Sequence, residues 1–318
     1  MKKMVFRTAV AAVLCFSIQI SAAAAQMLIP VGKVVGLSLS EGSVTVVAFD
    51  DTLGAPARQA GLQVGDEILT VDKTDIDSAA DLHQALKRSD GTVLVTVARD
   101  QKQHELSIKP SVTGDGPRLG VYVREGVTGI GTITYYDPDS GTFGALGHGV
   151  SDARGKLAQM NTGNIYQASV VSVKPGQSGK PGQLKGSVSA AEPIGRLQRN
   201  CPYGVFGSCE GFSGEALPIG KAVQGPAEIL SNVHGDAVET FSVQITKLFD
   251  EDNDTGRDLM LCITDPELLE TTGGIVAGMS GSPLIQDGKL GGAVTHVLVN
   301  DPTMGYGIFI ENMLDAAL

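Results

Sequence analysis

The chain has 318 residues, of which 42% are apolar, and it carries a formal net charge of -11. This length and apolar content are enough for two domains with buried cores. The acidic charge, with no basic stripe along the sequence, excludes nucleic acid as an expected partner because phosphate backbones would be repelled. Aromatic residues make up only 5% and 41 residues are glycine, which favours a turn-rich, mainly β architecture over long helices.

The first 25 residues have the pattern of an export signal. A cationic start precedes an apolar run over residues 8–20, and small residues suited to cleavage follow near Ala24 or Ala25. The apolar run is shorter than the roughly 20 residues that a membrane-spanning helix needs. We therefore expect export across the cytoplasmic membrane, with the segment either removed or, if the alanines extend it, kept as a tether.

Residues 30–110 are predicted to form an α+β module. The β-rich runs "SVTVVAF" and "TVLVTVARD" enclose a short helix at "APARQAGL" and a second helix whose N-cap is Ser78. This second helix carries His83, which is expected to point away from its apolar face. Residues 111–118 combine Pro, Gly and Ser without periodicity and are predicted to be a linker.

The stretch "APARQAGLQVGDEIL" resembles a bacterial PDZ domain. The resemblance implies that an extended peptide, such as a protein C-terminus, adds to a sheet edge beside the second helix. The loop that receives the peptide carboxylate would be "VVGLSL", with the amides of Gly36 and Leu37 as donors.

Residues 119–318 alternate short β-type runs with glycine-rich turns, which indicates an all-β barrel or sandwich. Within this region "GMSGSP" places Ser280 among glycines that allow the amides of Gly278 and Ser280 to turn into one concavity, as an oxyanion hole requires. A nucleophilic serine also needs a base, and His148 in "GALGHGV" follows a β-type run between two glycines. The alternative is a turn serine and a capping histidine in a scaffold that only binds.

These motifs, with "YGVFG", "ITDPELLETTGG" and "AVTHVLVNDP", resemble the stage IV sporulation protein B peptidases. The resemblance implies a trypsin-like double β-barrel preceded by the PDZ domain, and a catalytic triad of His148, Asp265 and Ser280. Asp265 lies close to Ser280 in the chain, whereas the acid of trypsin-like enzymes lies nearer the histidine. Asp236 and Asp152 therefore stay open as alternatives for the third member.

The family resemblance also implies a signalling role. Between the forespore and mother-cell membranes, the peptidase would cleave a membrane-bound inhibitor and so release an intramembrane protease that activates a sigma factor. The PDZ domain would hold a substrate tail or segments of the peptidase itself. No cofactor or metal is expected. The alternative function is that of an exported, non-catalytic PDZ adaptor that binds peptide tails.

Two further features carry expectations. With the strand period of two, Val294 and His296 share a face after the serine turn, so His296 could line the specificity pocket, or it could be a buried structural histidine. Cys201 and Cys209 flank "PYGVFGS" and could form a disulfide outside the reducing cytosol, with two unpaired thiols as the alternative.

Overall fold

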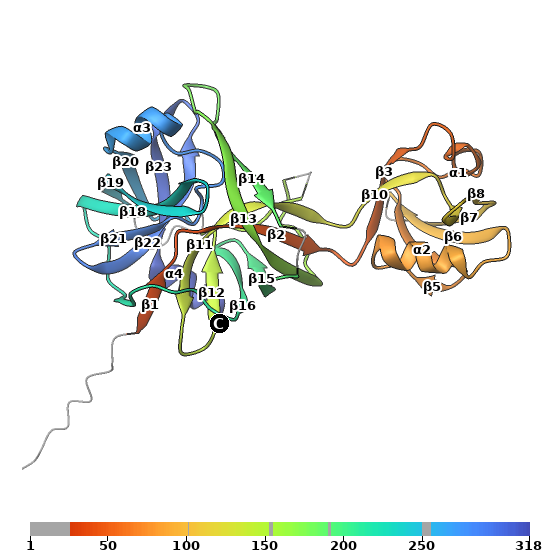
Figure 1. Ribbon diagram of the computed structural model, residues 1–318, viewed down its shortest axis with the longest axis horizontal. Coiled ribbons are helices and arrows are strands. Elements are labelled where there is room, and N and C mark those ends of the chain that lie inside the picture. Colours follow the sequence, from red (N-terminus) through yellow and green to blue (C-terminus); the bar gives the residue numbers. More distant parts are fainter. Residues whose placement is uncertain (1–25, 101, 153–154, 190–191, 250–255) are drawn as a thin grey trace, which may run out of the picture.

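The computed structural model describes residues 26–100, 102–152, 155–189, 192–249 and 256–318. The predicted export signal lies outside these residues. Within them the chain forms two β-barrels side by side and a smaller α+β module at one end of the molecule (Figure 1). No helix in the described part of the chain is both long enough and apolar enough to cross a membrane.

The first barrel is a ring of antiparallel strands that closes because β11 pairs with both β2 and β12. Its core is built from apolar side chains that alternate along these strands, as in the buried face of β2. The ring consists of β2 (Val34–Ser40), β11 (Val127–Asp137), β12 (Thr142–Ala145), β16 (Gly204–Cys209), β15 (Gly195–Cys201) and β13 (Thr162–Lys174). Outside the ring, β1 (Met27–Pro30) pairs with β11 and β17 (Leu217–Pro218), and β14 (Gln183–Val188) pairs with β13.

The second barrel is also closed, and with the first it confirms the predicted double β-barrel. Its ring runs through β18 (Gly225–His234), β19 (Ala237–Leu248), β20 (Leu259–Ile263), β23 (Asp301–Phe309), β22 (Lys289–Leu298) and β21 (Pro283–Gln286). The helix α3 (Pro266–Thr272) follows β20. The C-terminal helix α4 (Ile310–Ala317) packs its buried Ile310 and Met313 into a cluster that contains residues of both barrels.

The smaller module has its own sheet and its own core, as predicted. Two helices accompany the sheet, and Ser78 caps the second of them by accepting a hydrogen bond from the amide of Asp81. The sheet order is β10 (Val121–Arg124), β3 (Val44–Phe49), β4 (Glu67–Val71), β6 (Val93–Arg99) and β7 (Lys102–Ile108), with β5 (Thr74–Asp75) on β4. The helices are α1 (Ala55–Gln59) and α2 (Ala79–Lys87).

The boundaries of this module differ from those predicted. Val34–Ser40, expected inside it, forms β2 of the first barrel and pairs with β11 and β13 along its length. Residues 111–118, expected as a linker, form the hairpin of β8 (Ser111–Thr113) and β9 (Gly116–Arg118). The module is thus inserted between β2 and β11 and does not precede the barrels, and Figure 1 shows the two connections that join it to the first barrel.

Of the two alternatives for Cys201 and Cys209, the structure has the unpaired thiols and not the disulfide. The segment between them is a hairpin of β15 and β16 in which Cys201 pairs with Gly204 and Cys209 pairs with Gly195. The cysteines therefore lie at opposite ends of the hairpin. Five residue steps at about 3.4 Å each separate these ends, well beyond the ~7 Å between Cα atoms that a disulfide can bridge.

Candidate active site

The turn that carries Ser280, residues 278–282, is called the serine turn below. It belongs to the second barrel but is held by the first. The hydroxyl of Thr132 on β11 donates to the carbonyl of Gly278 (2.8 Å), and the amide of Thr132 donates to the carbonyl of Ser280 (3.3 Å). Gly281 has φ +97°, and a Cβ there would lie 2.1 Å from the carbonyl oxygen of Thr132. The glycine after Ser280 is therefore required both for its backbone conformation and for the close approach of the two barrels.

The turn that carries His148, residues 146–148, is called the histidine turn below. It belongs to the first barrel and contacts the second. After β12 the chain passes through two residues with positive φ, Leu146 (70°) and Gly147 (68°), before it reaches His148. A left-handed conformation is unfavourable for leucine by about 1–2 kcal/mol, so packing must maintain it. A Cβ on Gly147 would lie 2.7 Å from Cγ2 of Thr295, which shows that this turn lies directly against β22 of the second barrel.

The two turns meet in one groove of about 640 Å³. The first barrel contributes His148 and apolar side chains of β2 and β11, and the second contributes Gly278, Ser280 and His296. The structure thus brings together the predicted base and the predicted nucleophile, which are far apart in the chain.

The amides of the serine turn are available to a ligand. Among the hydrogen bonds of the described residues, neither the amide of Gly278 nor that of Ser280 donates to a protein acceptor, whereas those of Met279, Gly281 and Ser282 donate to carbonyls. Two unpaired N–H groups on either side of one residue, at the wall of a groove, form the arrangement that stabilises a developing oxyanion. The predicted role of Gly278 and Ser280 is compatible with this geometry.

His148 is half-buried, and this burial lowers the pKa of its imidazole, with the hydrogen bond to the carbonyl of Gly149 acting in the opposite direction. That bond, 3.0 Å from Nδ1, places the proton of the neutral ring on Nδ1 and leaves Nε2 as the acceptor. The hydroxyl of Ser280 donates to the carbonyl of Thr295 at 2.7 Å. A hydroxyl has a single proton. The Ser280 hydroxyl must therefore break its hydrogen bond to the Thr295 carbonyl before it can pass this proton to His148.

Comparisons with known proteins bear on this groove. Residues 115–314, more than half of the chain, match the family model described as SpoIVB peptidase S55. The chain belongs to the SpoIVB peptidase S55 family. Residues 34–109 match the model of the PDZ domain. The protein is therefore a serine endopeptidase that contains a PDZ domain.

Solved structures and curated proteins were compared as well. The PDZ domain of an SdrC-like protein from Listeria monocytogenes is 23% identical, covers 25% of this chain and 85% of its own, and has a TM-score of 0.22. Two inactive forms of the protease Rv3671c from Mycobacterium tuberculosis, one a serine-to-alanine mutant, are 14% and 13% identical with TM-scores of 0.33. They cover 60% of this chain and 82% and 83% of their own. No curated protein matches the chain.

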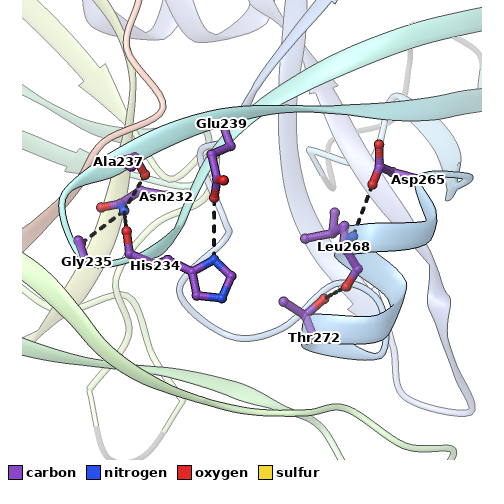
Figure 2. Close-up of polar contacts among 8 residues, drawn as sticks. All are labelled: Asn232, His234, Gly235, Ala237, Glu239, Asp265, Leu268 and Thr272. Carbon is purple, nitrogen blue, oxygen red and sulfur yellow. Dashed lines mark hydrogen bonds and ion pairs between the residues drawn. The ribbon is translucent and has the colours of Figure 1, made fainter.

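The S55 peptidase uses Asp265 differently from what the sequence predicted. Its carboxylate is the N-cap of α3 and accepts hydrogen bonds from the amides of Glu267 (3.0 Å), Leu268 (3.1 Å) and Ser242 (3.3 Å). Figure 2 shows the cap on Leu268 and, one turn further along α3, the hydroxyl of Thr272 donating to the Leu268 carbonyl. These backbone donors occupy the carboxylate, and Asp265 does not line the groove of the S55 peptidase.

The other two candidate acids of the S55 peptidase are likewise engaged elsewhere. Asp236 accepts a hydrogen bond from the hydroxyl of Ser169 (2.7 Å), and Asp152 accepts one from the amide of Lys156 (3.0 Å). Neither lines the groove, and in the described part of the chain no acidic side chain does. His234 is also accounted for, since it lies 3.5 Å from Glu239 at the exposed β18–β19 turn (Figure 2).

The ring beside the imidazole of His148 in the S55 peptidase is that of His296. The centroids of the two rings are 5.0 Å apart and their planes are inclined by 39°. Burial, with smaller contributions from His148 and Arg257, lowers the pKa of His296 to about 4, so the ring is neutral near pH 7. Its Nδ1 is buried without a hydrogen-bond partner among the described residues. The sequence placed His296 beside the serine turn but gave no sign of its contact with His148.

The predicted carboxylate loop of the PDZ module belongs to the first barrel of the S55 peptidase. Gly36 and Leu37 are paired within β2 of the first barrel and cannot serve as the carboxylate loop of the module. A groove of about 380 Å³ lies between α2 and β10, which is the edge strand of the sheet, and is lined by Leu82, His83 and residues 118–123. His83 thus lines the groove and does not point away from it as expected, and its Nδ1 is buried and unpartnered among the described residues.

Within the described residues, no group of three or more His, Cys, Asp and Glu side chains is placed so that it could hold a metal ion.

Proposed function

We propose that this S55 peptidase hydrolyses peptide bonds with Ser280 as nucleophile and His148 as base. The observation that carries the proposal is the shared groove, which both side chains and the two unpaired amides of Gly278 and Ser280 line. Ser280 attacks the peptide carbonyl, its proton passes to Nε2 of His148, and the two amides bind the oxyanion. His148 then protonates the leaving amine, and water, activated by the same imidazole, releases the acyl group from Ser280.

The groove supports a substrate with aliphatic side chains around the bond that is cut. Leu37 and Leu39 of β2 and Val127 and Ile130 of β11 line it, so an apolar side chain buried there would lose unfavourable contact with water. The exposed edge of β10 in the PDZ module supports a second site, at which an extended tail adds as a strand beside α2 and residues 118–121 receive its carboxylate.

The biological role that we propose follows from the family. After export by the N-terminal segment, the peptidase cleaves a membrane-bound regulatory protein between the forespore and mother-cell membranes and so releases an intramembrane protease that activates a sigma factor. The PDZ groove binds the tail of that regulator or a segment of the peptidase. The second candidate function is an exported PDZ adaptor, which the unpaired edge of β10 alone would support.

An experiment with peptides separates the peptidase from the adaptor. The exported protein is incubated with a library of peptides of varied sequence, and the products are identified by mass spectrometry. Cleavage beside aliphatic residues that disappears in Ser280→Ala supports the peptidase. Peptide binding that persists in both proteins without any cleavage supports the adaptor.

The signalling role is tested in the source organism. Chromosomal replacement by Ser280→Ala is expected to stop processing of the membrane-bound regulator and activation of the sigma factor. Unchanged sigma-factor activation, together with Ser280-dependent cleavage in the purified protein, would contradict the signalling role and leave the peptidase proposal intact.

A further inference from the structure

Among the described residues, His148 has no carboxylate partner of the kind that a catalytic base ordinarily has. When it takes the proton of Ser280 it becomes a cation, and in a triad the charge is stabilised by a carboxylate at Nδ1. Here Nδ1 bonds to the carbonyl of Gly149, and no acidic side chain in the described part of the chain lines the groove. The imidazolium would therefore form in a partly buried site, where an uncompensated charge is costly.

The closest ring to His148 is that of His296. Its centroid lies 5.0 Å away, within the ~6 Å over which a cation is attracted to the face of an aromatic ring. Within the part of the chain that the structure describes, the charged and titratable groups that shift the pKa of His296 are His148 and Arg257, and both oppose its protonation. A neutral ring can lie beside an imidazolium without repelling it, whereas a second cation could not.

The backbone fixes the position of His296 relative to the catalytic groups. It follows Thr295, whose carbonyl holds the hydroxyl of Ser280 and whose methyl group lies against the histidine turn at Gly147. The pairing register of β22 with β23 shifts between Val294 and His296, so this point of the strand is irregular. The simple alternation that would put His296 on the same face as Val294 therefore does not hold here.

We propose that His296 is a positioning residue that holds the ring of His148 and stabilises its cationic form through the ring face. The proposal rests on the proposed function, because it assigns a partner to the base of that reaction. It replaces the expected role of His296 in a specificity pocket. A neutral imidazole is a weaker partner for an acidic substrate side chain than a cation would be, and its contact within the protein is with His148.

The test uses a small, uncharged fluorophosphonate, which reacts with an activated serine and has no side chain to fill a specificity pocket. The rate of labelling of the exported protein is measured as a function of pH for the wild type, His296→Leu and His296→Phe. Leucine fills much of the same space without a ring face, and phenylalanine restores the face without the nitrogens. His234→Leu is the matched control, because that histidine is exposed and contacts Glu239 at the β18–β19 turn.

We expect His296→Leu to slow labelling about tenfold. The acid limb of the profile, which is the fall of the labelling rate at low pH, should move to lower pH because loss of the ring face disfavours protonated His148. His296→Phe should label within about threefold of the wild type, and His234→Leu should equal it. If His296→Leu does not fold, as judged by thermal unfolding, His296→Gln replaces it with the same expectation. The pKa of His148 is then read by NMR in the Ser280→Ala background.

Three results would overturn the proposal. The first is labelling of His296→Leu at the wild-type rate with an unchanged acid limb. This result counts against the proposal even if the variant cleaves peptides with a changed preference. The second is a slowed rate with an unmoved limb. The third is an equal loss in His296→Phe, which would assign the role to the ring nitrogens. Failure of the proposed function is a different result, namely a wild-type protein that is not labelled or is still labelled in Ser280→Ala.

Discussion

The hydroxyl of Thr132 donates a 2.8 Å hydrogen bond to the carbonyl of Gly278, although 146 residues separate them in the chain. A strand of the first barrel thereby fixes the turn that presents Ser280 from the second. Gly147 makes the reverse contact, from the histidine turn to Thr295. The groove that His148 and Ser280 line therefore depends on the close approach of two separately closed barrels.

Gly281→Ala should disrupt this approach. The new Cβ would lie 2.1 Å from the carbonyl oxygen of Thr132 and 2.6 Å from the amide of Leu146, and φ at this position is +97°. We expect a loss of more than about 3 kcal/mol in the free energy of unfolding and a loss of activity. Gly288→Ala is the matched control, since φ there is +70° with nothing within 4 Å, and it should cost about 1–2 kcal/mol. Equal costs in a chemical denaturation experiment would argue against tight barrel contact.

Asp265 should matter for stability and not for chemistry. Asp265→Ala removes the cap of α3 and is expected to cost about 1 kcal/mol, whereas Asp265→Asn keeps a capping side chain and should cost less. Both variants should be labelled by a fluorophosphonate within about twofold of the wild-type rate. A triad acid behaves differently, because its replacement by asparagine lowers the rate on the order of 10⁴-fold. A loss of that size in Asp265→Asn would restore the aspartate to the triad.

The pH dependence follows from burial of His148. Burial lowers its pKa below the ordinary 6.5, and the base must be neutral to accept the proton of Ser280. Activity should therefore persist below pH 6.5 and disappear only as the pH falls through the lowered pKa. The measurement is the labelling rate from about pH 4 to pH 8. A half-maximal rate at or above pH 6.5 would contradict the burial of the base.

The burial of His296 makes the stability of the fold sensitive to acid. Between pH 6.5 and the pKa of about 4 of His296, the unfolded chain binds protons that the folded His296 does not, so the free energy of unfolding must fall as the pH falls. Replacing this histidine by glutamine removes the titration, and the variant should show a smaller decrease in denaturation experiments across this range. An identical slope in the two proteins would show that His296 is not buried in its neutral form.

The cysteines give a direct chemical test of the hairpin. Cys201 and Cys209 should both react with iodoacetamide in denaturant without a reducing agent, as should Cys262. Peptide mapping identifies the modified residues. A peptide in which Cys201 is linked to Cys209 would show that the β15–β16 pairing is wrong.

The sequence predicted the barrels, the PDZ module and the pair of His148 and Ser280 because local signals encode them. Glycines that allow left-handed or crowded backbone flank both residues, and such positions can be recognised without knowledge of the fold. That β2 belongs to the first barrel and not to the PDZ module could not be recognised from such local signals. A run such as "VVGLSL" indicates a strand, but its partners β11 and β13 lie far along the chain, and pairing at that distance leaves no local pattern.

The N-cap position of Asp265 did leave a signal in the sequence. An aspartate before a proline and a glutamate, ahead of two leucines, is the pattern of an N-cap with proline at the first helical position. The family resemblance overrode this pattern. No comparable signal exists for the contact between His148 and His296, because it arises where two turns of different barrels meet and where the register of β22 shifts.

The central claim is that Ser280 is activated by His148 in the groove between the barrels. The most direct measurement is to label the purified protein with a fluorophosphonate and to locate the adduct by peptide mapping. The adduct is expected on Ser280 and should be absent from His148→Ala, with a loss in rate on the order of 10³-fold or more. Labelling of another serine, or labelling of Ser280 at an unchanged rate without His148, would contradict the account.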